Sequence, residues 1–314
     1  MLTCVHYKGD AYEYGRYIGS KHAHLKKMMT LFKRNYTFSQ NIIEIKSVLQ
    51  KYCPQLLEEI VGIQEGLEIS EVDVFQLFAG YDMPKLQTFG CTSVATKDFY
   101  VRNYDFSPEI YDGSFLVYEN LEGDQVCGNS QMLVGRLDGM NHHGLVVGLH
   151  YVHQEPYRKG FLCSTIVRIV LEICCNVEEA IDLLKELPHA SSYNYSLMDK
   201  EGNIAVFESS TDHYQVDRGA DKVVCVNMFQ TKAMKQYNPH HVVRSTNRLN
   251  ELGKIFIEDW SVEDAHEWFN SRQSPVFFTD YKDYFGTLYT VSYVPQTKQI
   301  QLTPFDGEMK QIYL

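Results

Sequence analysis

A glycine, a thiol and two hydroxyl groups stand together in the stretch FGCTS, residues 89–93. A cysteine thiol is the strongest nucleophile among the uncharged side chains, but it needs a proton acceptor nearby or a lowered pKa. No histidine follows Cys91 within several residues, which weakens a papain-like interpretation. The sequence therefore leaves two alternatives for Cys91, an ordinary buried thiol or the centre of a reaction.

The peptide bond between Gly90 and Cys91 offers another source of a base. If this bond is cleaved, the new α-amino group of Cys91 lies beside its own sulfur and can accept the thiol proton. An α-amino group titrates near about pH 8, so part of it is neutral under cellular conditions. Glycine before the cysteine permits the close approach that such a self-attack needs. A Gly-Cys pair alone is more often a small residue beside a buried thiol.

The segment Arg102-Asn103-Tyr104-Asp105 follows in a strand pattern. Arg102 and Asp105 share a face only if that strand bends or ends there. In that case the Asp105 carboxylate could hold an ammonium at the Cys91 amine, and the Arg102 guanidinium could fix the carboxylate or a thiolate. The alternative is a surface ion pair at a strand end.

Polar side chains also end two apolar strands. His150 closes GLVVGLHY and can hydrogen-bond into a pocket, or it is an ordinary edge-strand histidine. Asn227 closes VVCVN, where its amide can stabilise an oxyanion or begin a turn. Between two strands, Asn141 opens the polar turn NHHG; its adjacent histidines splay apart and lack a completing thiol or carboxylate motif, so no metal site is predicted.

The pattern of elements changes at FGCTS. Helical spacing before it predicts an almost wholly helical segment up to residue 88, with Pro54 in the first turn of a new helix and the SEVDV stretch as the cap of a short one. Strands in runs and helices in runs favour antiparallel sheets with helices outside them, an α+β fold. The polar and aromatic segment 272–285 is a candidate loop near a pocket. The predicted helices are 10–34, 42–52, 54–67, 161–174, 177–187, 240–252 and 261–269; the predicted strands are 92–96, 99–105, 115–120, 130–141, 144–152, 194–199, 203–209, 213–217 and 222–227, with a closing hairpin at 286–307.

Composition narrows the class of protein. A chain of 314 residues with 44% hydrophobic and 22% charged residues is typical of a globular protein of one or two domains. A net charge of −11 argues against nucleic acid as a partner, and the basic run between Lys21 and Arg34 is interpreted as a solvated helix face. The absence of a signal-like start or a long apolar run predicts a cytoplasmic protein with no membrane partner. The eight scattered cysteines predict mostly free, buried thiols.

Several segments, taken in order, resemble the acyl-CoA:6-aminopenicillanic acid (isopenicillin N) acyltransferase family of self-processing N-terminal nucleophile (Ntn) cysteine hydrolases, which is related to penicillin V acylases and choloylglycine hydrolases. The resemblance runs over roughly residues 9–250. It is carried by GDAYEYGRYIGSKH (9–22), PQLLEEIVGIQEGLEISEVDVFQL (54–77), GCTSVAT (90–96), RNYDF (102–106), GMNHHGLVV (139–147), STIVRIVLE (164–172) with EEAIDLL, and CVNMF (225–229).

The resemblance implies a four-layer αββα sandwich of two antiparallel sheets, cleaved between Gly90 and Cys91 into a helical leader, 1–90, and a catalytic domain, 91–314. Cys91 would be the nucleophile and, through its freed amine, the base. Asp105 would orient that amine, and Asn227 would form the oxyanion hole. Arg102 matches an arginine of the bile-salt and penicillin V branch. The resemblance further implies a supporting role for Arg248, and substrate contacts for Tyr104, Asn141, His150 and Ser245; several relatives have Asn where His150 stands.

The expected activity is that of an amidohydrolase or acyltransferase acting on linear non-peptide amides or acyl thioesters. A penicillin V or bile-salt type hydrolase and an unprocessed binding protein, with the leader plugging the pocket, are the alternatives. With no dinucleotide or P-loop motif, no cofactor is expected, although an acyl-CoA could donate the acyl group. Whether the chain forms a homo-oligomer stays open.

Overall fold

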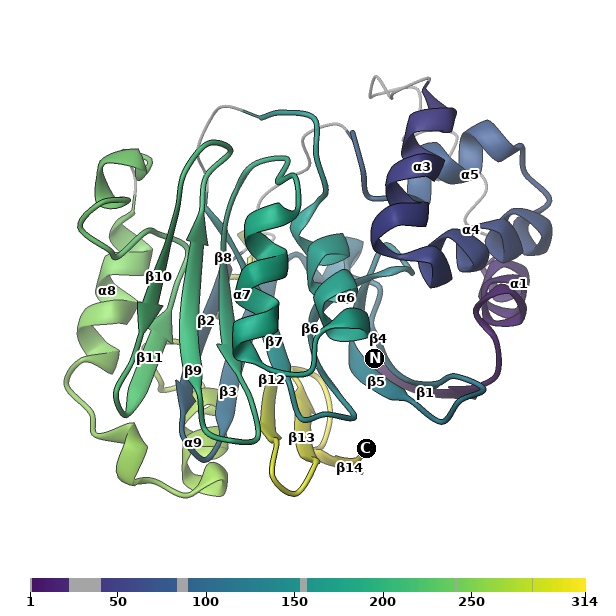
Figure 1. The fold of residues 1–314 in the computed structure, drawn as a ribbon. Helices are drawn as coiled ribbons and strands as arrows, with labels where there is room; N and C mark the ends of the chain where they lie inside the picture. Colours follow the sequence, from purple (N-terminus) through teal and green to yellow (C-terminus); the bar gives the residue numbers. More distant parts are fainter. Residues whose placement is uncertain (1, 23–40, 84–89, 153–156, 241, 284) are drawn as a thin grey trace.

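The structure is a computed structural model that describes residues 2–22, 41–83, 90–152, 157–240, 242–283 and 285–314. Within these ranges the strands form two sheets that pack face to face, and β2 (Gly90–Thr96) of one sheet contacts β7 (Val146–Val152) of the other. Helices cover both outer faces (Figure 1). The predicted α+β fold with αββα layers is confirmed. The larger sheet is covered by α6 (Cys163–Ile173) and α7 (Val177–Glu186), and the smaller by α8 (Val243–Leu252) and α9 (Val262–Asn270).

Strand order brings distant parts of the sequence together. In the described part of the chain the larger sheet has the order β1-β4-β5-β6-β7-β8-β9-β10, and the smaller has β11-β2-β3-β12-β13-β14. Both β2 and β7 lie inside their sheets, and all their residues are buried because each sheet is covered on both faces. The remaining strands are β1 (Thr3–Lys8), β3 (Tyr100–Phe106), β4 (Ser114–Glu119), β5 (Gln125–Gln131), β6 (Gly135–Asn141), β8 (Ser192–Met198), β9 (Ile204–Ser209), β10 (Tyr214–Arg218), β11 (Lys222–Cys225), β12 (Gly286–Val294), β13 (Gln299–Pro304) and β14 (Lys310–Tyr313).

The first strand corrects the expectation of an almost wholly helical start. β1 pairs in parallel with β4, from Thr3 opposite Ser114 to Lys8 opposite Glu119. The larger sheet is therefore antiparallel except at this edge. Beyond the predicted closing hairpin, β14 adds a further edge strand to the smaller sheet, paired with β13.

The N-terminal helices begin where local chemistry directs. Asp10 caps α1 (Ala11–Lys21), Pro54 opens α4 (Pro54–Leu67), and Ser70 caps α5 (Glu71–Phe78), as the sequence predicts for the last two. The helix α3 (Ile42–Tyr52) precedes α4. Of the helix predicted over residues 10–34 and its basic run, the part from residue 23 onward lies outside the described residues.

One hydrophobic core joins the N-terminal helices to the sheets. Ile60 and Ile63 of α4 belong to the same buried cluster as Leu137 of β6 and Ile166 of α6. A buried ion pair of 2.6 Å between Glu59 and Arg168 crosses the same boundary. All eight cysteines are free and six are buried, as predicted.

Helices α1 and α4 cross at glycines. A Cβ atom at Gly15 would lie 2.0 Å from the carbonyl oxygen of Glu59, and one at Gly62 would lie 2.0 Å from the carbonyl oxygen of Tyr12. Real Cβ atoms do not approach backbone so closely, so both helices need glycine to pack at this separation.

Gly15→Ala is therefore expected to lower the free energy of unfolding by about 1–3 kcal/mol, because the added methyl forces the two backbones apart. Urea denaturation measures the change. Gly253→Ala is the matched control, because its Cβ would meet no atom closer than 3.4 Å. Equal stability of the two variants would contradict the close-packing explanation.

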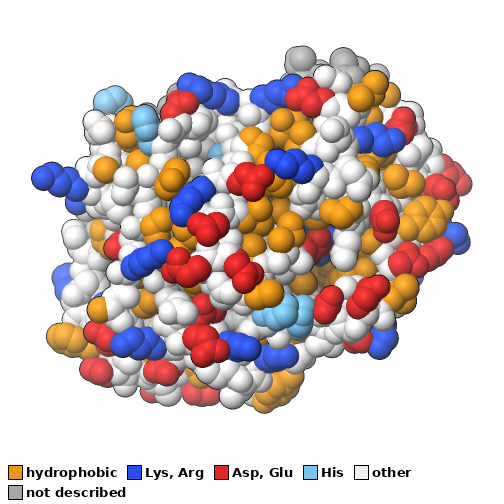
Figure 2. Space-filling view, in the orientation of Figure 1, with side chains coloured by type: hydrophobic (Ala, Val, Ile, Leu, Met, Phe, Trp, Pro, Cys, Tyr) orange, Lys and Arg blue, Asp and Glu red, His pale blue; other side chains and the backbone are white. Residues whose placement is uncertain are grey.

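Surface charges are paired more than clustered. On the face shown in Figure 2, Lys and Arg are interspersed with Asp and Glu, and among the described residues of that face they form no continuous basic surface. Ion pairs such as Lys51 with Glu186, at 2.9 Å, account for part of this arrangement. Within the described ranges, no helix combines the length and apolar character needed to cross a membrane.

Candidate active site at the start of β2

Register places the reactive residues on two faces of the smaller sheet. In the pairing of β2 with β3, Gly90 lies opposite Asp105, Cys91 opposite Tyr104, and Ser93 opposite Arg102. Because side chains alternate along a strand, Cys91 and Arg102 face the larger sheet, while Asp105 faces the opposite side. All three are fully buried. Two predictions for Arg102 and Asp105 are therefore wrong: the two side chains do not share a face of the strand, and they do not form a surface ion pair.

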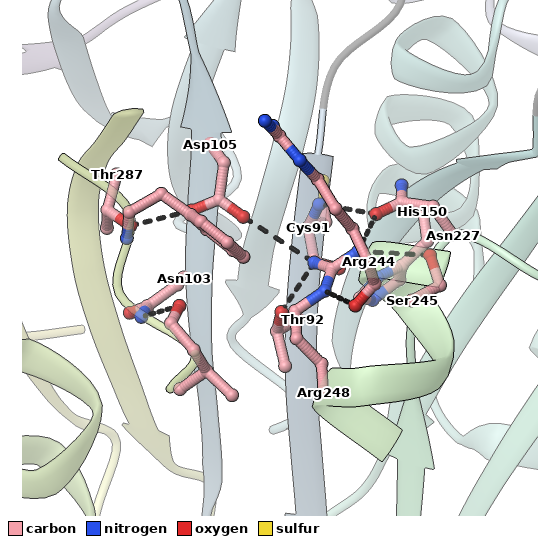
Figure 3. A network of polar contacts seen from close by, with 12 residues as sticks. Cys91, Thr92, Asn103, Asp105, His150, Asn227, Arg244, Ser245, Arg248 and Thr287 are labelled. Atoms are coloured by element: carbon pink, nitrogen blue, oxygen red, sulfur yellow. Dashed lines mark hydrogen bonds and ion pairs between the residues drawn. The ribbon is translucent and has the colours of Figure 1, made fainter. Parts of the chain in front are cut away.

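The main chain of Cys91 is held by two distant side chains. Its N–H donates to Oδ1 of Asn227 at 2.8 Å, and its carbonyl accepts from Nη1 of Arg248 at 2.8 Å. Arg248 also donates to Oδ1 of Asn227 at 3.0 Å, which closes the arrangement seen in Figure 3. The neighbouring strand β11 ends at Cys225, opposite Ser93, so the sheet ladder stops short of Cys91. Asn227 takes the hydrogen bond that the ladder no longer provides.

Arg248 is itself positioned by hydroxyl groups. It donates to Oγ of Ser245 at 3.1 Å, within α8, and to Oγ1 of Thr92 at 2.7 Å. The sequence predicts Ser245 and Arg248 together, whereas Thr92 stands out only as one of the two hydroxyl groups of FGCTS, with no role assigned to it. Of these contacts, the one to Thr92 joins α8 directly to β2.

The Asp105 carboxylate lies beside this group. Its Oδ1 accepts from Oγ1 of Thr287 at 2.7 Å, and its Oδ2 lies 3.5 Å from Nη1 of Arg248. That Oδ2 has no hydrogen-bond partner in the described part of the chain. Burial raises the pKa of Asp105 to about 6, while the charge of Arg248 and the Thr287 hydrogen bond oppose the rise. Oδ2 of Asp105 can therefore accept a hydrogen bond from a cationic group at the start of β2.

Because the pKa of Asp105 is raised, any reaction that needs its carboxylate should slow as the pH falls. The folded chain binds this proton more tightly than the unfolded chain, so protonation stabilises the fold as the pH falls through about 6, while the ionised form is lost. The positive charges of Arg248, Arg102 and Arg244 act on this carboxyl as well, and these side chains stay charged in this range. Because Asp105 is expected to orient the freed amine of Cys91, the rate at which an acyl group is transferred to Cys91 of the cleaved chain should fall at least about tenfold for each pH unit below about 6.

Mass spectrometry of samples taken over time gives that rate, and circular dichroism at each pH checks that the fold persists. A rate that stays flat between about pH 5 and pH 7 would contradict this assignment.

Arg102 is anchored between the sheets. Its Nη1 donates to the carbonyl of Leu137 at 2.6 Å, its Nη2 donates to the carbonyl of Leu149 at 2.9 Å, and its ion pair is with Asp138, at 3.4 Å. A β-bulge in β6 produces this arrangement: Asn129 pairs with Asp138 but Ser130 pairs with Arg136, which leaves Leu137 as the extra residue. The bulge turns the Asp138 carboxylate inward and re-aims the strand toward Arg102.

Asp138 is satisfied by further buried groups that the sequence analysis missed. Its carboxylate accepts from the hydroxyl of Tyr289 at 2.5 Å, the hydroxyl of Tyr293 at 2.6 Å and the amide of Asn129 at 2.9 Å. The available signal was an acidic residue, Asp138, inside the predicted strand segment GRLDGMN.

The Cys91 thiol needs help to ionise. Burial raises the pKa of the Cys91 thiol to about 12, and the nearby charges of Arg102 and Arg248 only partly offset this. Asp105 contributes to the rise. The thiol is therefore protonated at neutral pH, and its use as a nucleophile requires a local base.

His150 lies in the middle of the larger sheet, on β7 between β6 and β8, so the edge-strand alternative is wrong. Its Nε2 lies 3.0 Å from Oγ of Ser93 and 3.1 Å from Oγ of Ser196. Its Nδ1 has no hydrogen-bond partner among the described residues. Burial, together with the charge of Arg102, lowers the pKa of His150 well below its usual value, so the ring is neutral.

The other two predicted substrate-binding residues differ in position. Tyr104 is buried directly across from Cys91, with its ring stacked on Tyr289 at 5.5 Å. Asn141 ends β6, next to Met140, which pairs with Val146 at the start of β7; Val146 lies roughly 13 Å from His150 at about 3.3 Å per residue. The amide of Asn141 donates to the carbonyls of Leu171 and Cys174, and its oxygen accepts from the N–H of His143 and Leu145. The structure thus brings Tyr104, but not Asn141, to the thiol.

Within the described ranges, no three or more His, Cys, Asp and Glu side chains are grouped so that they could hold a metal ion. Of the segment 272–285, which the sequence suggests as a loop near a pocket, Phe285 lies beside the site, since an ideal Cβ atom at Gly90 would lie 2.8 Å from its Cζ.

Comparisons with known proteins were made on sequence and on structure. Residues 94–306 match the family described as acyl-coenzyme A:6-aminopenicillanic acid acyl-transferase. This match begins just after Cys91 and includes Asp105, Asn227 and Arg248. A search of curated proteins finds no match.

Solved structures with similar folds include three hydrolases or acylases. A conjugated bile acid hydrolase from Clostridium perfringens has 12% identity and a TM-score of 0.48, over 72% of this chain and 92% of that one. An N-acylethanolamine-hydrolyzing acid amidase ortholog from Caenorhabditis elegans has 16% identity and a TM-score of 0.48, over 66% and 93%. Penicillin V acylase from Agrobacterium tumefaciens has 16% identity and a TM-score of 0.43, over 72% and 86%. Because the family match spans well over half of the sequence, the chain belongs to the acyl-coenzyme A:6-aminopenicillanic acid acyl-transferase family.

Proposed function

We propose that this chain is a self-processing cysteine Ntn amidohydrolase or acyltransferase for linear non-peptide amides or acyl thioesters. The observation that carries the proposal is that Asn227 and Arg248 both hydrogen-bond to the main chain of Cys91, beside the Asp105 carboxylate. Because β11 ends at Cys225, opposite Ser93, the sheet ladder does not satisfy the backbone of Cys91 on this side, and the side chains of Asn227 and Arg248 do so instead. Family membership adds acyl transfer as the class of reaction.

Maturation would be an intramolecular acyl transfer. The Cys91 sulfur adds to the carbonyl carbon of Gly90, the C–N bond breaks, and the thiol proton passes to the departing nitrogen. Water then hydrolyses the thioester, which leaves a carboxylate on Gly90 and a free thiol and α-amino group on Cys91. The products are the leader, residues 1–90, and the catalytic domain, residues 91–314.

Turnover would reuse the same atoms. The α-amino group of Cys91 takes the thiol proton, and Asp105 orients that amine through its uncommitted oxygen. The sulfur attacks the acyl carbon of the substrate, and Asn227 with a backbone N–H stabilises the oxyanion. The C–N or C–S bond of the substrate then breaks, and the departing amine or thiol takes the proton from the α-ammonium group, which leaves the acyl group on Cys91 as a thioester. Arg102 faces the thiolate, Arg248 supports Asn227, and Tyr104 and His150 line the substrate side. Water or an amine resolves the thioester, so hydrolysis and transfer differ only in the acceptor.

Two alternative functions for the chain would give different results in the test described below. A penicillin V or bile-salt type hydrolase would use the same residues with water as the acceptor. An unprocessed binding protein would keep the leader attached over the site, and the complete burial of Cys91 in the uncut chain favours this version.

Intact-mass measurement of the purified chain separates these functions. We expect two fragments that divide the 314 residues after Gly90, and one acyl group on the larger fragment after incubation with amides or acyl thioesters. Peptide mapping should place this group on Cys91. A wild-type chain that stays whole at every pH tested supports the binding protein instead, and acyl label that persists in Cys91→Ser as a thioester elsewhere overturns the assigned nucleophile.

A further inference from the structure

Gly90 is enclosed on the side where a side chain would project. An ideal Cβ atom at Gly90 would lie 2.8 Å from Cζ of Phe285 and 3.1 Å from Cβ of Asp105. Asp105 is fixed by its register opposite Gly90 in the sheet, so its Cβ has little freedom to retreat. The α-carbon of Gly90 therefore has room for its two hydrogens but not for a methyl group.

Phe285 is held in this position by its neighbours. The guanidinium of Arg244 lies over the Phe285 ring at 4.6 Å, and the Phe278 ring meets it edge-on at 5.4 Å. Arg248, one turn after Arg244 on α8, lies over Phe278 at 5.6 Å. Figure 3 shows Arg244 rising from α8 toward the start of β2. Moving the ring away from Gly90 would break its cation–π contact with Arg244.

The proposed chemistry relates the surroundings of Gly90 to the acyl group of the substrate. In the proposed maturation, the first acyl group that Cys91 receives is the carbonyl of Gly90, and the α-carbon of that acyl group is the Gly90 Cα. In turnover the same sulfur, at the start of the same strand, attacks the acyl carbon of a substrate. The groups that surround the Gly90 Cα are therefore placed to meet the α-carbon of the substrate acyl group.

We propose that Phe285 is a specificity-determining residue that restricts the acyl group to one with an unsubstituted CH₂ at its α-carbon, such as a straight-chain or arylacetyl group. Acyl groups with a branch at this carbon meet the Phe285 ring and the Asp105 Cβ, as a Gly90 side chain would. This inference rests on the proposed function, since it needs Cys91 to accept an acyl group.

The first test uses maturation itself and needs no substrate. Gly90→Ala is expected to slow cleavage at least tenfold, and Gly90→Ala with Phe285→Ala is expected to recover most of that loss. The single variant Phe285→Ala gives the reference rate against which the double variant is compared. Phe305→Ala, which removes a partly buried ring packed on Tyr281 instead, is the matched control and should not rescue Gly90→Ala. Rescue by Phe305→Ala, or none by Phe285→Ala, overturns the proposal.

The second test uses the cleaved enzyme and does not depend on how Gly90→Ala folds. Mass spectrometry compares the rates at which a phenylacetyl thioester and a 2-phenylpropionyl thioester acylate Cys91. We expect the wild type to prefer the phenylacetyl group at least tenfold, and Phe285→Ala to reduce this preference severalfold. Equal rates in the wild type, or an unchanged preference in Phe285→Ala, contradict the assigned role.

Failure of the proposed function gives a different result. A wild-type chain that neither cleaves nor acquires either acyl group contradicts the proposed function. A wild-type chain that cleaves normally but shows no rescue by Phe285→Ala contradicts only the role of Phe285. If the cleaved enzyme accepts neither thioester, the maturation test decides alone.

Discussion

Cys91→Ala is expected to leave the chain uncut and to lower the rate of acyl transfer at least roughly a thousandfold. The substitution removes the sulfur, the one atom that both proposed reactions require. It leaves the local structure in place, because Asn227 and Arg248 contact the main-chain nitrogen and oxygen of Cys91 and not its side chain. The loss should therefore be chemical, with the fold retained.

Intact mass and the rate of amide or thioester turnover measure the two parts of this prediction. Cys225→Ala is the matched control, because Cys225 is equally buried on the neighbouring strand β11. It should cleave and turn over like the wild type. Cleavage of Cys91→Ala after Gly90 would sink the assignment of the nucleophile.

Asp138→Asn is expected to lower the free energy of unfolding by about 3–5 kcal/mol, because it leaves the buried Arg102 guanidinium without its counter-ion. Both members of this pair have no exposed side-chain surface. The asparagine keeps the shape of the carboxylate but removes its charge. The hydroxyl groups of Tyr289 and Tyr293 donate to different oxygens of Asp138, and the amide nitrogen that replaces one of these oxygens cannot accept a hydrogen bond.

Guanidinium chloride denaturation measures this change, and two further variants separate its causes. Tyr293→Phe loses one hydrogen bond to Asp138 while the ion pair remains, so it should cost only about 1 kcal/mol. Arg102→Met with Asp138→Asn removes both charges and should be more stable than Asp138→Asn alone. A stability of Asp138→Asn within about 0.5 kcal/mol of the wild type would show that the pair contributes little.

Local signals predict the helices outside antiparallel sheets, and the family resemblance predicts the αββα layers and singles out the candidate site. Helical spacing, Pro54 and the Ser70 cap locate α4 and α5, and family motifs locate Cys91 and Asp105. The structure brings Asn227 and Arg248 to the same point as Cys91. Their roles in catalysis stay predictions.

Elements with weak local signals are missed. β1 is partly exposed along its length, and only its last four residues, Val5 to Lys8, alternate between partly buried and exposed, which is the shortest run that marks a half-buried strand. Residues 130–141 were predicted as one strand, but Met132 and Leu133 adopt left-handed backbone angles, with φ of 52° and 66°, and divide the segment into β5 and β6. Apolar residues seldom occupy such a turn, so the sequence carries no sign of it.

Side-chain contacts that depend on the pairing of strands distant in the sequence also cannot be predicted from local sequence patterns. Asp138 reaches Arg102 only because a bulge shifts the register of β6, and Thr287 reaches Asp105 through the pairing of β12 with β3. The position of His150 in a central strand depends on the strand order of the whole sheet. None of these features follows from spacing along the chain.

A chain that began at Cys91 would lack β1 and would leave β4 at the open border of the larger sheet. Its unpaired N–H and C=O groups would then offer a template for other chains, and Phe115 and Leu116 would make that border apolar. The opening residues of the chain thus protect the sheet from association with other copies. A catalytic domain produced without them should aggregate, and a separate peptide that supplies residues 3–8 together with the N-terminal helices should keep it dispersed.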